Sequence, residues 1–129
     1  KSSKMQLWQK LNCIGHLNAS FAAREGKKLI TQEFIETKDG ERIKLDMQHG
    51  IIVKEVESNK NLLQLIKVAK ESNLQVIEFT REMLTEKDDK KLIEITKNKN
   101  LSEIEFLGVL VFGKRSIVEK LTEKFELLK

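Results

Sequence analysis

Apolar residues return every three or four positions in four stretches of the chain, a spacing typical of helices that bury one face. The first stretch, LWQKLNCIGHLNASFAARE, also carries unusual chemistry near its start, because Trp8, Asn12, Cys13 and His16 lie among its apolar positions. The helices expected from this spacing run from about Leu7 to Arg24, from Asn59 to Asn73, from Thr85 to about Asn98, and from Gly113 to about Phe125.

Residues with special backbone or capping behaviour indicate where these helices begin and end. Gly26 and Asn73 stand where a left-handed residue closes a helix, and Ser58 or Asn59 stands where a side chain caps one. Thr85 and Asp88 resemble a capping box for the third helix.

Shorter runs between the helices have the composition of strands. Two runs flank Asp39-Gly40 in ITQEFIETKDGERIKLD, a dipeptide that favours a hairpin with a type I′ turn. IIVKEV at 51–56 and LQVIEFT at 74–80 predict two more strands. IEFLGVLVFG at 104–113 is nearly continuous in apolar residues, which indicates a central strand covered on both faces.

Strands that alternate with helices predict an α/β fold, here a three-layer α/β/α sandwich. The sheet is expected to be mixed and mostly parallel, with about four strands plus the hairpin, in one domain over residues 1–129. Ligands of such sheets gather where strands end and helices begin. The two turns of that kind are 80–83 and 112–115.

Composition narrows the class of protein. With 40% hydrophobic and 34% charged residues the chain has a globular rather than a disordered profile. Its 24 basic and 20 acidic residues alternate as on a solvated surface, so the charge of +4 permits contact with phosphate or nucleic acid without requiring it. The single cysteine excludes an internal disulfide and, with no membrane-spanning run, predicts a cytoplasmic protein without a membrane partner.

Two segments resemble a known family. GIIVKEVESNKNLLQLIKVAKESNLQVIEFT resembles the strand–helix–strand unit of the peptidyl-tRNA hydrolase II family, and FLGVLVFGKRSIVEKLTEKFELL resembles its closing strand, glycine turn and helix. WQKLN at 8–12 is similar to a group of uncharacterised bacterial proteins that share this fold. The resemblance covers residues 8–129 and implies an opening strand before the first helix, so the first strand of the domain is expected to be missing here.

The same resemblance implies a hydrolase site. Lys10 and His16 are similar to the ends of the family's helix motif, and Lys10 would then be catalytic, with Asn12 and Thr80 as polar partners. Arg81 stands where the family has an acidic residue, which favours binding without catalysis.

Polar residues at the start of the first helix and at the two strand-to-helix turns form the candidate site. Trp8, Asn12 and His16 are four positions apart and share one helix face, and the free N–H groups of a helix start favour an anion. The alternative interpretation is structural, with Trp8 covering a sheet edge and the glycine turn carrying solvent-facing cations. The expected ligand-binding residues are Trp8, Gln9, Asn12, Thr80, Arg81, Gly113 and Lys114.

Neither a metal nor a cofactor is expected. Cys13, His16 and His49 have poor spacing for a zinc site, and Cys13 with His16 lacks the third group of a nucleophilic site. The leading hypothesis is a domain that binds a small anionic or nucleotide-like ligand, with its cations around one hollow. The alternatives are a divergent peptidyl-tRNA hydrolase acting on tRNA, and a homodimer joined through an apolar face or a sheet edge.

Overall fold

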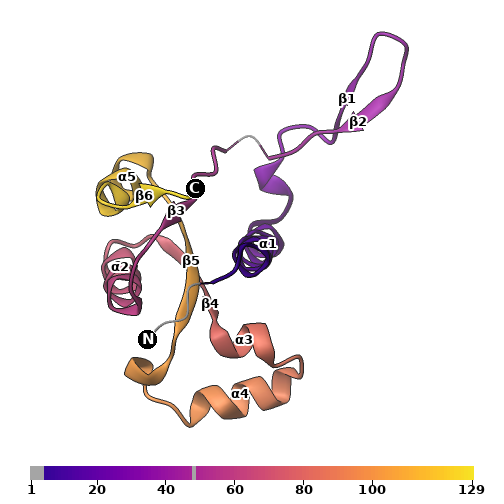
Figure 1. The fold of residues 1–129 in the computed structure, drawn as a ribbon. Coiled ribbons are helices and arrows are strands. Elements are labelled where there is room, and N and C mark those ends of the chain that lie inside the picture. The colour runs from indigo at the N-terminus through magenta and orange to yellow at the C-terminus, as the bar shows by residue number, and fades with distance from the viewer. Residues whose placement is uncertain (1–4, 48) are drawn as a thin grey trace.

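The computed structural model describes residues 5–47 and 49–129, which form helices around pairs of short strands (Figure 1). The elements in chain order are α1 (Leu7–Glu25), the 3₁₀ helix η1 (Gly26–Leu29), β1 (Phe34–Glu36), β2 (Arg42–Lys44), β3 (Lys54–Glu55), α2 (Asn59–Glu71), β4 (Gln75–Thr80), α3 (Arg81–Thr85), α4 (Asp89–Lys97), the 3₁₀ helix η2 (Leu101–Glu103), β5 (Phe106–Phe112), α5 (Arg115–Thr122) and β6 (Glu126–Leu127).

The antiparallel pair of β4 and β5 is the centre of the molecule. Gln75 lies opposite Phe112 at one end of the pair, and Thr80 lies opposite Phe106 at the other. Both α1 and α2 pack against these two strands, and Figure 1 shows them on opposite sides of β5. The apolar composition of β5 therefore matches its position between two helices, but in a two-stranded pair it is not the central strand of a larger sheet that the sequence predicted.

The two faces of the pair carry separate apolar clusters. On the α1 side, buried Cys13 and Leu17 pack with Phe79. On the α2 side, buried Leu62 and Ile66 pack with Ile104 and Phe106. Helix α2 thus buries most of the stripe that its spacing predicted, whereas α1 buries Leu17 and Phe21 with Cys13 and leaves Leu7 and Leu11 exposed.

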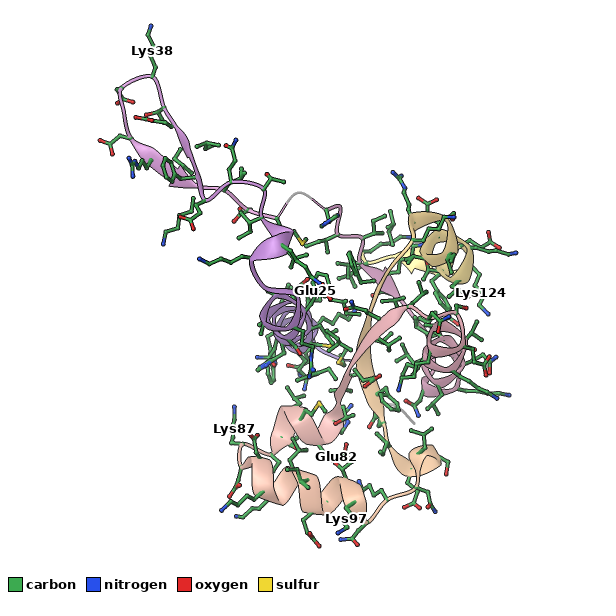
Figure 2. All side chains as sticks on the ribbon, turned by 180° about the vertical axis from the view of Figure 1, so that it is seen from behind. Glu25, Lys38, Glu82, Lys87, Lys97 and Lys124 are labelled. Carbon is green, nitrogen blue, oxygen red and sulfur yellow. The ribbon has the colours of Figure 1, made fainter. Side chains whose placement is uncertain are left out.

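The β1–β2 hairpin projects from this body as an arm, with Lys38 at its tip (Figures 1 and 2). Glu36 pairs with Arg42, so the connection has five residues rather than the two of a type I′ turn. Gly40 has a φ of 88°, whereas Asp39 does not have a positive φ. The hairpin prediction is confirmed, and the turn type is wrong because Thr37 closes the longer loop through bonds to Asp39 and Glu41.

The predicted sheet is wrong. Within residues 5–47 and 49–129 the strands form three separate antiparallel pairs, β1–β2, β3–β6 and β4–β5, and not a mostly parallel four-stranded sheet in a three-layer sandwich. The reason is the path between β4 and β5. Helices α3 and α4 turn the chain at one end of the pair, so β5 returns antiparallel to β4 (Figure 1).

Local signals predicted most helix ends. Gly26 and Asn73 have φ values of 69° and 59°, and the Ser58 hydroxyl accepts a hydrogen bond from the Asn61 N–H. The predicted third helix is instead divided, because α3 ends at Thr85 and Asp88 alone caps α4.

Two other boundaries differ. The strand predicted over 51–56 is only β3 at 54–55, and the last helix stops at Thr122, after which β6 pairs with β3.

Candidate functional site

A groove of about 950 Å³ runs between α1 and β4, with α3 and α4 supplying the remaining wall. We call it the α1–β4 groove. Its polar and aromatic lining consists of Trp8, Asn12, His16, Ser20 and Arg24 from α1, Lys70 from α2, Gln75, Glu78 and Phe79 from β4, and Glu86, Lys87 and Asp89 from the α3–α4 region.

The wall from α1 is a single row of side chains. Trp8, Asn12, His16, Ser20 and Arg24 are four positions apart, and this spacing places them on one helix face. Trp8 is 57% exposed, and its indole N–H donates to the Gln6 side chain at 2.8 Å. The row therefore presents an aromatic side chain near the start of α1 and a guanidinium near its end.

His16 forms the middle of this row. Its imidazole stacks on the ring of buried Phe79, with the ring centroids 5.2 Å apart and the planes within 17° of parallel. Because His16 is itself exposed and lines the groove, the pair offers a planar surface held by the core beneath it.

Charges of both signs line the α1–β4 groove. Lys70 forms an ion pair with Glu78 at 3.2 Å, which balances that carboxylate. Arg24 bonds to the Ser20 hydroxyl at 3.3 Å through Nε, so its cation is not balanced by that contact. Lys87 lies on the connection between α3 and α4 (Figure 2), beside the acidic residues of that wall.

The residues predicted from the start of α1 separate into two groups. Trp8 and Asn12 line the groove. Gln9 instead accepts the Gln6 N–H at 2.9 Å and caps the helix. Lys10 points elsewhere, because its ammonium binds Glu55 at 2.8 Å.

Thr80 and Arg81 have structural contacts at the end of β4. The buried Thr80 hydroxyl accepts the Met83 N–H at 3.3 Å and caps α3. Arg81 donates to both carboxylate oxygens of Glu105, at 2.6 and 3.0 Å. These bonds raise the pKa of Arg81 and hold the pKa of Glu105 below its ordinary value.

Gly113 and Lys114 lie at the opposite end of the β4–β5 pair from Thr80. Phe112 pairs with Gln75, and Phe21 near the end of α1 contacts Phe112 with ring centroids 4.8 Å apart. The start of α1, with Trp8, is therefore directed toward the other end. The expectation that the cations of both turns face one hollow is wrong, because the antiparallel register separates these turns.

The thiol and imidazole groups do not converge either. Cys13 is buried, and burial raises the pKa of its thiol to about 11, so the thiol stays protonated near neutral pH. His49 stacks edge-on against Phe112, at the far end of β5. Among the residues that the structure describes, no group of three or more His, Cys, Asp or Glu is placed to hold a metal ion.

Several groove residues were missed by the sequence analysis. Ser20 and Arg24 extend the spacing of Trp8, Asn12 and His16, so the helical period could have found them. Lys70, Glu78 and the α3–α4 wall carry no such signal, because only the tertiary fold brings them to α1.

In the described parts of the chain, no helix has the length and apolar character that crossing a membrane requires.

Comparisons with known proteins identify relatives of unknown function. A family model described as "Protein of unknown function (DUF2000)" matches residues 2–129. The chain is also similar in structure to Atu0240, a protein of unknown function from Agrobacterium tumefaciens strain C58, with a TM-score of 0.81 and 19% sequence identity. That match covers 98% of this chain and 91% of the other, and it shows a shared fold. No curated protein matches the chain.

Proposed function

The chain belongs to the DUF2000 family of proteins of unknown function, and from the geometry of its groove we propose that it binds a small nucleotide-like ligand. Such a ligand combines a planar ring with an anionic group. The observation that carries the proposal is the exposed His16 imidazole, stacked on Phe79 in the same groove that contains Arg24.

The ring of the ligand is expected against His16 and Trp8. Stacked aromatic groups favour a further planar ring, and the Asn12 amide between these two residues offers both a donor and an acceptor to a ring edge. Phe79 fixes the imidazole from below, so little side-chain freedom is lost when a ligand binds.

The anionic group is expected toward Arg24. Arg24 lies eight positions after His16, which corresponds to about 12 Å along a helix, close to the length of a nucleoside monophosphate. A guanidinium binds phosphate oxygens through paired donors. The carboxylate of Glu78 also lines the groove and would repel an anionic ligand. This repulsion is reduced because Lys70 forms an ion pair with Glu78.

Titration with AMP, with adenosine and inorganic phosphate as separate probes, tests the proposal. Trp8 is the single tryptophan of the chain and lines the groove, so its fluorescence reports occupancy directly. We expect saturable quenching by AMP and weaker quenching by adenosine. Arg24→Ala should weaken AMP binding at least tenfold, whereas His16→Ala should weaken AMP and adenosine alike.

Arg115→Ala is the matched control, because Arg115 is an exposed arginine on α5 that pairs with Glu119. Its affinity for AMP should equal that of the unsubstituted protein. If AMP neither changes the fluorescence nor raises the melting temperature, or if Arg24→Ala and Arg115→Ala behave alike, the proposal is wrong.

A further inference from the structure

One face of the β1–β2 arm is apolar and acidic. Ile35 and Ile43 pair across the two strands and remain about half exposed. Side chains two positions apart on a strand share a face, which places exposed Glu33 and Glu41 beside these isoleucines, whereas the cations of β2 alternate to the opposite face. Lys27 contacts Glu33 only at 3.7 Å, and both side chains stay exposed, so this ion pair is weak. We call these two glutamates and two isoleucines the acidic face of the arm.

The outer face of α4 is apolar and basic. Ile93 is 66% exposed, and exposed Lys90 and Lys97 lie three positions before it and four after it, on the same side of the helix. Neither lysine forms an ion pair among the residues that the structure describes. Of the nearby acidic residues, Asp89 lines the α1–β4 groove, and Glu94 bonds to an asparagine at the end of α4. We call Lys90, Ile93 and Lys97 the basic face of α4.

These two faces are similar in length and opposite in charge. Glu41 lies opposite Thr37, four positions along the arm from Glu33, which corresponds to about 13 Å along a strand. Lys90 and Lys97 are seven positions apart, which corresponds to about 10 Å along a helix. Isoleucine side chains lie between the charges on both faces. The acidic face can therefore cover the basic face with a carboxylate near each lysine.

The two faces lie at opposite ends of the molecule. Figure 2 shows Lys38, at the tip of the arm, at one end and Lys97 of α4 at the other. The arm therefore cannot reach α4 of its own chain, but it can reach α4 of a second copy that runs in the opposite direction. If a twofold axis relates the two copies, each arm meets the other copy's α4, so the contact forms twice and the assembly closes.

We propose that the chain forms a twofold dimer in which the acidic face of each arm binds the basic face of α4 in the other copy. Burial of the isoleucines supplies the attraction, and the charges fix the register. Because each contact is small, the dimer is weak and dilute protein is monomeric. The basic face does not line the α1–β4 groove, so this proposal and ligand binding in the groove can fail separately.

Reversing the charges on each face tests the proposal. The arm variant carries Glu33→Lys and Glu41→Lys, and the helix variant carries Lys90→Glu and Lys97→Glu. Each variant alone places like charges opposite each other, so sedimentation equilibrium should show self-association at least tenfold weaker than that of the unsubstituted chain. In an equimolar mixture of the two variants, opposite charges meet at both contacts. The mixture should therefore form a heterodimer, with an affinity within about threefold of the unsubstituted dimer.

A variant with Lys60→Glu and Lys67→Glu is the matched control, because these exposed lysines of α2 are also seven positions apart. It should dimerise like the unsubstituted chain. Circular dichroism checks that all variants keep their helices. The proposal is overturned if the unsubstituted chain stays monomeric up to about 1 mM, or if the control variant loses as much association as the helix variant. It is also overturned if the folded arm and helix variants each still dimerise, or if their mixture does not.

Discussion

Gly108 determines how closely α1 approaches β5. A Cβ atom at this position would stand 2.5 Å from the Cys13 sulfur and 3.2 Å from a Leu17 methyl carbon. The absent side chain therefore lets the helix lie on the strand, and the buried thiol fills the space that results.

Gly108→Ala is expected to lower the free energy of unfolding by about 1–3 kcal/mol, the usual cost of overpacking a core. Combining it with Cys13→Ala should reduce that cost, because the atom that the new methyl group meets is gone. Urea unfolding of the unsubstituted protein, the two single variants and the double variant measures how far the two changes in unfolding free energy depart from additivity.

Gly15→Ala is the matched control, since a Cβ there meets no atom within 4 Å and the residue lies inside α1. It should leave stability unchanged or raise it by up to about 1 kcal/mol. Strictly additive effects of Cys13→Ala and Gly108→Ala would contradict the contact described here.

At the scale of elements, the β1–β2 arm stands apart from the helices and strands of the body. Its residues Ile35 and Ile43 pair across the two strands, and both remain about half exposed, at 47% and 52%. The guanidinium of Arg42 covers the Phe34 ring at 4.3 Å, so the arm is held together by its own side chains.

Replacing residues 34–44 with a short Gly-Ser linker is expected to change the unfolding free energy of the rest by less than about 0.5 kcal/mol, because the lost contacts are internal to the arm. Circular dichroism during urea unfolding measures this. A loss of several kcal/mol would mean that the arm supports the body.

The elements also show what the sequence could predict. Ser58, Asn73 and Gly26 marked helix ends correctly, because caps and left-handed residues act over one turn of backbone. The spacing of Trp8, Asn12 and His16 placed them on one face, and the groove includes all three.

Strand direction carried no comparable signal. The sequence of residues 104–112 carries no signal for the direction of the strand. Its direction is set by α3 and α4, which turn the chain back at one end of β4 and make the pair antiparallel. The same long-range geometry put Lys10 beside Glu55 and Gly113 far from Thr80, so the predicted set of site residues was divided.

At the scale of the whole molecule, one ion pair joins α3 to the start of β5 and a second joins α3 to the end of α4. Glu105 pairs with Arg81 at 2.6 Å, and Glu82 pairs with Lys99 at 2.6 Å. Burial is the largest influence on the pKa of Glu82 and raises it, but the hydrogen bonds from Lys99, the backbone and Thr80, together with the charge of Lys99, outweigh it, so the pKa is lowered. Hydrogen bonds from Arg81 lower the pKa of Glu105.

Stability should therefore fall in acid. A carboxyl whose pKa is lower in the folded state contributes fully above its ordinary value of 4.5, and that contribution is lost as the pH falls through the folded pKa. Glu105→Gln should cost roughly 0.5–1 kcal/mol at pH 7, the range of a partly exposed pair.

Urea unfolding at pH 7 and at pH 3.5 tests this directly. The difference between the unsubstituted protein and Glu105→Gln should shrink at the lower pH, because below the ordinary pKa of 4.5 the carboxyl takes up a proton, first in the unfolded state, and the contribution of the ion pair is progressively lost. If the difference in unfolding free energy is the same at both pH values, the ion pair with Arg81 does not cause the loss of stability in Glu105→Gln.

The projecting arm has one more consequence. Its tip at Lys38 lies far from the body (Figure 2). Helix α1 comes before Lys38 in the sequence, and the strands β4 and β5 against which it packs come after it. A single backbone cut at that tip would yield two fragments whose association depends on buried apolar surface instead of covalent continuity. The chain is thus divisible there, and its two parts would behave as a complementing pair.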